Sequence, residues 1–271
     1  MSKPHVLVTG ATGSQGGHVA GALLAAGHPV SALVRRPESA AAAALAREGA
    51  TLVVGDLTDV PSLVAALEPV DAAYAVTTPF GDGVDAEVAQ GRAIIAAARE
   101  AGLGWLLLAS VASAGRADVP HFRSKAAIED ELRATDLPWT VVAPSYFYEN
   151  VAGGARDGRL PVPLPGDVPL HQLALADLGA AVAAILARRE EHVGARVELA
   201  GDAPTPREMA AALGAVHVET PLEEVEARSH DLAAMYRFLR DPGYGIDVAA
   251  VRERYPEVGW RSFADWAAAR P

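Results

Sequence analysis

The chain has 271 residues, of which 51% are hydrophobic and 21% charged, a composition typical of a folded globular protein with a large core. Its formal net charge of −11 argues against nucleic acid or an anionic membrane as a partner, and its lack of cysteine excludes disulfides, thiolate catalysis and cysteine-based zinc sites. No apolar run reaches the length of a membrane span, and the first strand is predicted close to Met1, so we expect a cytoplasmic protein without a signal peptide.

The first 26 residues predict a strand, a glycine-rich turn and a helix. An apolar run over residues 5–8 is followed by three glycines at G-x-x-G-x-x-G spacing and an Ala/Leu-rich stretch to Ala26. In this context the turn is predicted to bind a dinucleotide. A helix N-terminus offers free N–H groups to phosphate, and glycines allow a sharp turn and close approach of the backbone to a pyrophosphate. The residues predicted to contact the phosphates are Gly10, Thr12, Gly13, Ser14, Gln15 and Gly16.

A second strand, predicted over residues 29–34, ends in Arg35 and Arg36. Arg35 lies nineteen residues after Gly16, about where an NAD site usually carries an acidic residue for the ribose 2′-hydroxyl. A guanidinium binds a 2′-phosphate that a carboxylate would repel. The sequence therefore favours NADP(H) over NAD(H), with a solvated arginine pair at a strand end as the alternative.

The third and fourth strands are predicted over residues 51–54 and 71–76. Asp56 and Leu57 follow the third strand and are predicted to contact the cofactor. Asp56 would accept a hydrogen bond from the adenine amino group, with a role in its own turn as the alternative. Ligands of doubly wound sheets bind beyond the carboxyl ends of the strands. The segment after the fourth strand is therefore predicted to lie along the cofactor, toward the nicotinamide; its residues are Thr77, Thr78, Pro79 and Phe80.

A long helix over residues 84–101, a fifth strand over 105–109, a helix from His121 to about Ala134 and a sixth strand over 139–143 continue the alternation. Ser110 stands at the carboxyl end of the fifth strand and is predicted to contact the cofactor. This order predicts an α/β fold with a Rossmann-type doubly wound parallel sheet.

After Pro144 the regular alternation ends. We expect residues 1–150 to form the nucleotide-binding domain, with 167–200 returning to it, and residues 151–166 and 201–271 to form a small C-terminal α+β substrate lobe. Residues 170–175 are predicted as a strand and 221–239 as one helix. Tyr146 and Tyr148 are predicted to line a cleft, where either could orient an aromatic substrate or supply a proton.

Several motifs occur in a consistent order along nearly the whole chain: residues 8–13, 34–36, 55–57, 76–80, 124–125 and 144–150. Taken together, they resemble the NmrA-like group of atypical short-chain dehydrogenases/reductases. The resemblance implies an NAD(P)-binding Rossmann domain, a small C-terminal lobe and a cleft between them. It further implies NAD(P)H-dependent reduction of quinones, dyes or phenolic ethers, or else nucleotide binding that regulates a protein partner without catalysis.

Ordinary members of the wider group carry Tyr-x-x-x-Lys, in which the lysine binds the nicotinamide ribose. Here the lysine is Lys125 and the tyrosine position is His121. The resemblance implies the ribose role for Lys125, and the chain's only other lysine is Lys3. An imidazole can donate a proton as hydride arrives, so His121 is a candidate proton donor, with an exposed histidine at a helix start as the alternative.

The sequence therefore predicts an NADPH-dependent reductase acting on a flat, apolar substrate such as a quinone or enone. Lys125, His121, Tyr146 and Tyr148 are its candidate catalytic residues, and no metal is expected. The alternatives are an NADP(H)-sensing regulatory protein with a protein partner and a natural-product tailoring reductase. A homodimer is left open.

Overall fold

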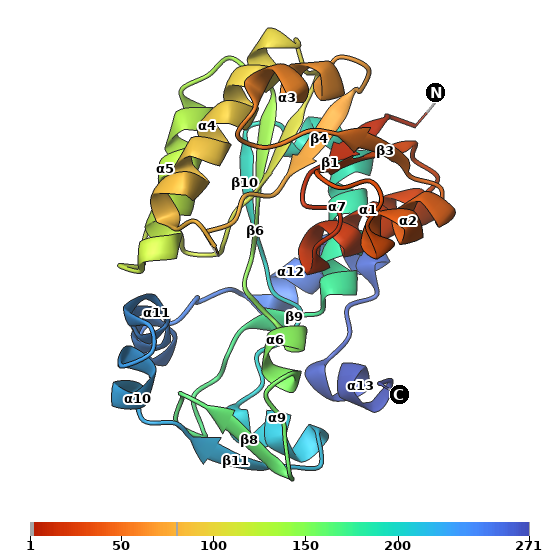
Figure 1. The fold of residues 1–271 in the computed structure, drawn as a ribbon. Coiled ribbons are helices and arrows are strands. Elements are labelled where there is room, and N and C mark those ends of the chain that lie inside the picture. Colours follow the sequence, from red (N-terminus) through yellow and green to blue (C-terminus); the bar gives the residue numbers. More distant parts are fainter. Residues whose placement is uncertain (1–2, 80, 271) are drawn as a thin grey trace. The chain divides into compact units, whose positions relative to one another are not determined.

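The computed structural model describes residues 3–79 and 81–270, which fold into two compact units (Figure 1). Unit 1 comprises Met1–Ser110, Ser124–Ala143 and Leu178–Val197. Unit 2 comprises Val111–Arg123, Pro144–Asp177 and Glu198–Pro271. Residues 111–123 and 144–150 thus cluster with unit 2, and the domain boundaries expected from the sequence stay a prediction.

Unit 1 is built on a seven-stranded sheet of order β10-β6-β5-β4-β1-β2-β3. The neighbouring pairs from β3 to β6 are all parallel, for example Val8 beside Ala32 of β2 and Tyr74 of β4. This arrangement confirms the predicted Rossmann-type doubly wound sheet. The strands are β1 Val6–Val8, β2 Val30–Val34, β3 Thr51–Val54, β4 Ala72–Ala75, β5 Leu106–Ala109, β6 Trp139–Pro144 and β10 Ala195–Leu199.

Helices cover both faces of this sheet, with α3, α4 and α5 on one face and α1, α2 and α7 on the other (Figure 1). Strands β1, β2, β4 and β5 are therefore buried along their whole length, which explains why their sequences are apolar except for Ser31 of β2. The helices are α1 Ser14–Ala25, α2 Ala40–Arg47, α3 Val60–Leu67, α4 Val84–Glu100, α5 Pro120–Arg133, α7 Leu175–Ala187 and α8 Arg189–His192.

Glycines set the close packing of two helix pairs in unit 1. A Cβ at Gly91 of α4 would lie 2.5 Å from the Ile128 side chain of α5. A Cβ at Gly179 of α7 would lie 2.6 Å from the carbonyl oxygen of His18 in α1. Larger side chains at either position would push the helices apart.

Unit 2 contains short strands and helices around its own apolar core. The parallel pairs are β7 with β9 and β8 with β11. Its strands are β7 Tyr146–Phe147, β8 Arg159–Val162, β9 Gln172–Leu173 and β11 Val216–Glu219. Its helices are α6 Tyr148–Ala152, α9 Pro206–Ala212, α10 Leu222–Glu226, α11 His230–Arg240, α12 Val248–Arg254, the 3-10 turn η1 Pro256–Val258 and α13 Phe263–Ala268.

Two predicted elements of this unit differ from those observed. The predicted strand over residues 170–175 is reduced to the two residues of β9. The single helix expected over residues 221–239 is wrong, because the chain forms α10 and α11 with a break between them. Ser229 starts the second helix, since its side chain accepts a hydrogen bond from the backbone N–H of Leu232. Within the described part of the chain, every helix is too short or too polar to cross a membrane.

Candidate functional site

The glycine turn joins β1 to α1 in unit 1. Gly10 has φ +60°, which a glycine adopts at little cost, and its carbonyl accepts a hydrogen bond from the N–H of Gly13 at 2.9 Å. A Cβ at Gly16 would lie 2.4 Å from the carbonyl oxygen of Gly10. The first turn of α1 can therefore lie this close to the end of β1 only because residue 16 is glycine.

The start of α1 has the chemistry of an anion site. Thr12, Gly13 and Ser14 are exposed, and the first turn has no side-chain cap and no acidic residue. Its backbone N–H groups and the positive end of the helix dipole thus fit a phosphate. Gln15 faces the sheet instead, since its Nε2 donates to the hydroxyl of Tyr74 at 2.8 Å.

Arg35 and Arg36 follow β2 and are exposed, while Asp56 follows the neighbouring strand β3. Asp56 serves its own turn: its Oδ1 accepts from the N–H and the hydroxyl of Thr58, both at 2.8 Å. These hydrogen bonds, with a smaller effect of the Arg35 charge, lower the pKa of Asp56. The turn alternative is thus observed, and the adenine contact stays a prediction. Leu57 is half-buried and packs on the core of unit 1.

The segment after β4 is tied to Lys125 of α5. Lys125 Nζ donates to the carbonyl oxygen of Thr77 at 2.9 Å, to the Thr77 hydroxyl at 3.0 Å and to Glu87 Oε1 at 2.8 Å. Burial lowers the pKa of Lys125, and the Glu87 carboxylate opposes that shift. Thr78 is exposed and Pro79 half-buried, whereas Phe80 lies outside the described residues.

Glu87, in the first turn of α4, is the residue of this group that the sequence analysis missed. Its side chain is fully buried, and its carboxylate also accepts from the hydroxyls of Thr77 and Ser124. The signal was present in the sequence, because Glu87 stands at helical spacing from the buried residues Gly91 and Ile94. A carboxylate on the buried stripe of a helix needs a partner, and lysine is rare in this chain.

The side chain of Ser110 is buried in the interior of unit 1. Its hydroxyl donates to Glu129, a buried carboxylate that also binds Arg133 at 2.6 Å and Arg196 at 2.9 Å. The hydroxyl proton of Ser110 is therefore donated to a protein acceptor, and the contact of Ser110 with the cofactor stays a prediction.

His121 lies in unit 2, at the start of α5 and four residues before Lys125. Its Nδ1 lies 2.8 Å from both carboxylate oxygens of Asp231, and its backbone N–H donates to Asp231 Oδ1 at 3.1 Å. Only 13% of the His121 side chain is exposed. The alternative of a solvent-exposed histidine is therefore wrong. No sequence pattern links His121 to Asp231, because Asp231 stands 110 residues further along the chain.

The two candidate tyrosines of unit 2 have different surroundings. Tyr146 is half-buried, and its hydroxyl lies 3.1 Å from that of Tyr236 in α11. Tyr148 is fully buried, donates its hydroxyl to the carbonyl of Arg261 at 3.1 Å and packs its ring edge-on against Phe263. Burial raises the pKa of both tyrosines. Tyr148 is thus a core residue of unit 2, and its predicted catalytic role is not supported.

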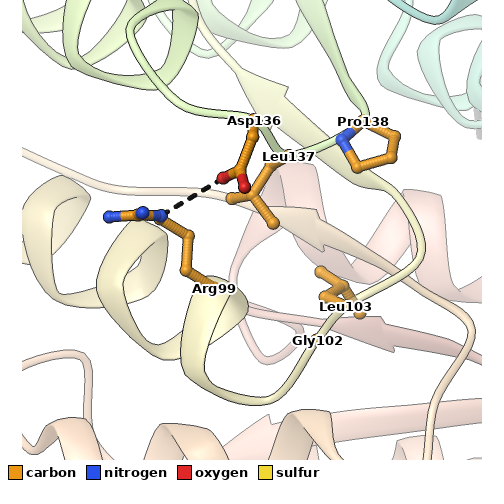
Figure 2. Close-up of a pocket in the computed structure, with 6 residues that line it drawn as sticks. All are labelled: Arg99, Gly102, Leu103, Asp136, Leu137 and Pro138. Atoms are coloured by element: carbon orange, nitrogen blue, oxygen red, sulfur yellow. Dashed lines mark ion pairs between the residues drawn. The ribbon is translucent and has the colours of Figure 1, made fainter.

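A separate pocket of about 240 Å³ lies at the other end of the sheet (Figure 2). Arg99 and Asp136 form an ion pair at 3.5 Å across it. Its lining residues belong to the end of α4 and to the loops before β5 and β6, that is, to the amino ends of these strands. Nucleotides bind doubly wound sheets at the carboxyl ends, so this pocket is not the predicted cofactor site.

The sheet and the glycine turn define a Rossmann-type dinucleotide-binding protein. More narrowly, the chain belongs to the NmrA-like family, whose sequence pattern matches residues 2–246. It is 36% identical over 259 residues to a (4-alkanoyl-5-oxo-2,5-dihydrofuran-3-yl)methyl phosphate reductase of Streptomyces griseus, covering 93% of this chain and 82% of that protein.

Two further matches extend over nearly the whole of both chains compared. An NAD(P)H azoreductase of Xenophilus azovorans is 29% identical, with 97% of each chain covered. The solved structure of the NADPH-dependent quinone oxidoreductase QOR2 of Escherichia coli, complexed with NADPH, shares the fold with a TM-score of 0.80 at 24% identity, covering 97% of this chain and 98% of that one. The two reductases matched by sequence support the predicted class, an NAD(P)H-dependent oxidoreductase.

Proposed function

We propose that the protein is an NADPH-dependent reductase that transfers hydride to a flat, apolar, electron-poor substrate, either an enone or a quinone. The observation that carries the proposal is the exposed, uncapped start of α1 behind a glycine turn, with two exposed arginines after the adjoining strand β2. This combination suits a dinucleotide that carries a 2′-phosphate.

In this proposal, the backbone of residues 10–16 binds the pyrophosphate, and Arg35 with Arg36 binds the 2′-phosphate. Thr78 and Pro79 border the rest of the cofactor. When bound, NADPH supplies the hydride, so the protein has to bind, orient and exclude water. The tyrosine position of Tyr-x-x-x-Lys is His121 in this chain, so the proton has to come from a group other than that tyrosine.

The substrate gains a hydride and a proton, which reduces an enone to a saturated carbonyl compound or a quinone to a hydroquinone. The name of the Streptomyces griseus relative describes an unsaturated lactone ring bearing an acyl group, which favours the enone. We assign the proton to His121, whose imidazole is oriented by Asp231 through Nδ1. We assign to Tyr146 the role of orienting the substrate.

The direct test follows nicotinamide absorbance while the protein is mixed with NADPH and a panel of alkanoyl butenolides, simple enones and quinones. A parallel calorimetric titration measures NADPH binding. Protein-dependent oxidation with any panel member supports the reductase, and the preferred compound defines the substrate class. NADPH binding without oxidation across the panel would favour the sensor alternative, and absence of binding would refute the nucleotide site.

Arg35→Glu is expected to weaken NADPH binding at least tenfold and to leave NADH binding within about threefold, because only NADPH carries the 2′-phosphate. A charge-assisted contact contributes about 1.5–3 kcal/mol, which corresponds to such a change in affinity. Arg47→Glu is the matched control, since Arg47 is an exposed arginine in the last turn of α2 and gives the same change in net charge. Equal losses for NADPH and NADH, or an equal effect of the control, would refute the role of Arg35.

A further inference from the structure

We propose that Glu87 is a positioning residue, which holds Lys125 against the turn after β4 so that the lysine fixes the backbone of Thr77. We call Thr77, Glu87, Ser124 and Lys125 the buried lock. The inference rests on the proposed nucleotide site, because the turn that the lock fixes is the one assigned to the cofactor. It differs from the role implied by the family resemblance, in which Lys125 itself binds the nicotinamide ribose.

All three N–H donors of the Lys125 ammonium have acceptors within the protein. An ammonium has three N–H groups, and three acceptor atoms of the protein lie within 3.0 Å of Nζ. Two of them belong to Thr77 and one to Glu87. A ribose hydroxyl could bind this ammonium only by displacing one of these protein acceptors.

The contacts also close a ring. The Thr77 hydroxyl accepts from Lys125 and donates to Glu87 Oε1 at 3.1 Å, and Glu87 in turn pairs with Lys125. Ser124 donates to the other carboxylate oxygen. Each group in the ring therefore meets a partner of the correct polarity, as a buried network requires.

Burial makes the members of the ring depend on one another. The Glu87 side chain is fully buried and that of Lys125 is 12% exposed. A charge at such depth is costly without its counter-charge. The lock joins the end of β4, the first turn of α4 and α5, all at the carboxyl edge of the sheet where nucleotides bind.

Between β4 and α4, the described residues 77–79 and 81–83 belong to no helix or strand. Gly81 (φ +122°) and Gly83 (φ +90°) adopt backbone conformations that other residues rarely take. Thr77 is buried, whereas Thr78 is exposed. Fixing Thr77 therefore sets where the exposed residues of the turn begin.

The test is a double-mutant cycle of Glu87→Gln, Lys125→Met and the two combined, measured by thermal unfolding and by calorimetric titration with NADPH well below the melting temperature. Lys125→Met leaves a buried carboxylate unpaired, so the melting temperature should fall by roughly 6–20 °C. The double variant should recover much of that loss. Additive changes in melting temperature would overturn the lock.

NADPH affinity separates the lock from ribose binding. Because the lock acts as a unit, all three variants should weaken NADPH binding by a similar factor, about tenfold. If Lys125 bound the ribose directly, Lys125→Met would lose affinity while Glu87→Gln, which keeps the ammonium, would bind NADPH like the unmodified protein; that result overturns the proposal. If Lys125→Met does not fold, the NADPH affinity of Glu87→Gln alone still distinguishes the positioning role from direct ribose binding.

A matched control lies on the same two helices. Arg92 of α4 and Glu131 of α5 form an ion pair at 2.7 Å, with 64% and 35% of their side chains exposed. The cycle of Arg92→Met and Glu131→Gln should change the melting temperature by no more than about 4 °C and leave NADPH affinity unchanged, because exposed pairs contribute little. If the unmodified protein fails to bind NADPH, the proposed function fails, while the melting temperatures still report on the lock.

Discussion

Gly16→Ala is expected to lower NADPH affinity at least tenfold and the melting temperature by several degrees. The added Cβ would lie 2.4 Å from the carbonyl oxygen of Gly10 and 2.8 Å from that of Thr9. Both are backbone atoms, so neither can rotate away as a flexible side chain could. The first turn of α1 must shift, at a cost of about 1–3 kcal/mol, and its N–H groups then leave the positions that fit a phosphate.

Gly21→Ala provides the matched control because it makes the same chemical change in the same helix. A Cβ at Gly21 has nothing within 4 Å. Alanine is favoured over glycine in a helix interior by about 1 kcal/mol, so this variant should melt at the same temperature or slightly higher, with unchanged NADPH affinity. Thermal unfolding and calorimetric titration of both variants test the expectation. Equal NADPH affinity in the two variants would refute the role assigned to the glycine turn.

The parts of the fold that local sequence pattern controls were predictable. Continuous apolar strands, the three glycines and the strand–helix alternation predicted the sheet and the turn between β1 and α1. The close approach at Gly16 was predictable too, because it depends on residues in one short segment. In unit 2 the elements are shorter and their ends depend on caps, so the break before Ser229 was missed.

Contacts between distant residues could not be predicted in the same way. Lys125 stood out by its rarity, but its ring needs α4 and α5 to pack against the end of β4. Tyr148 follows Tyr146 in an aromatic run, yet α6 begins at Tyr148 and turns it into the core of unit 2. The sequence showed which side chains were available, whereas tertiary packing decided which of them are buried.

The pairing of His121 with Asp231 leads to the second large effect. If His121 donates the proton, His121→Phe should lower kcat about a hundredfold or more, because general acid catalysis contributes 10²–10⁴-fold. NADPH affinity should stay within about threefold, because His121 is not assigned to the cofactor. An unchanged kcat would assign the proton to Tyr146 or to water.

Asp231→Asn tests how the carboxylate contributes. Asparagine keeps a carbonyl that can accept from the His121 backbone N–H, so the start of α5 retains its hydrogen bond, but the negative charge beside the imidazole is lost. The proton donor proposed for the reaction then lacks its charged partner. We therefore expect kcat to fall about tenfold, with KM little changed.

Glu226→Gln is the control for this substitution, because Glu226 also contacts a histidine, His230, but at an exposed site where 74% of the histidine side chain is accessible. It should leave kcat unchanged. If Asp231→Asn lowers the melting temperature without lowering kcat, Asp231 only stabilises the start of α5. A loss of kcat seen with Asp231→Asn and absent with Glu226→Gln would identify the half-buried carboxylate of Asp231 as the group that keeps His121 in place to donate its proton.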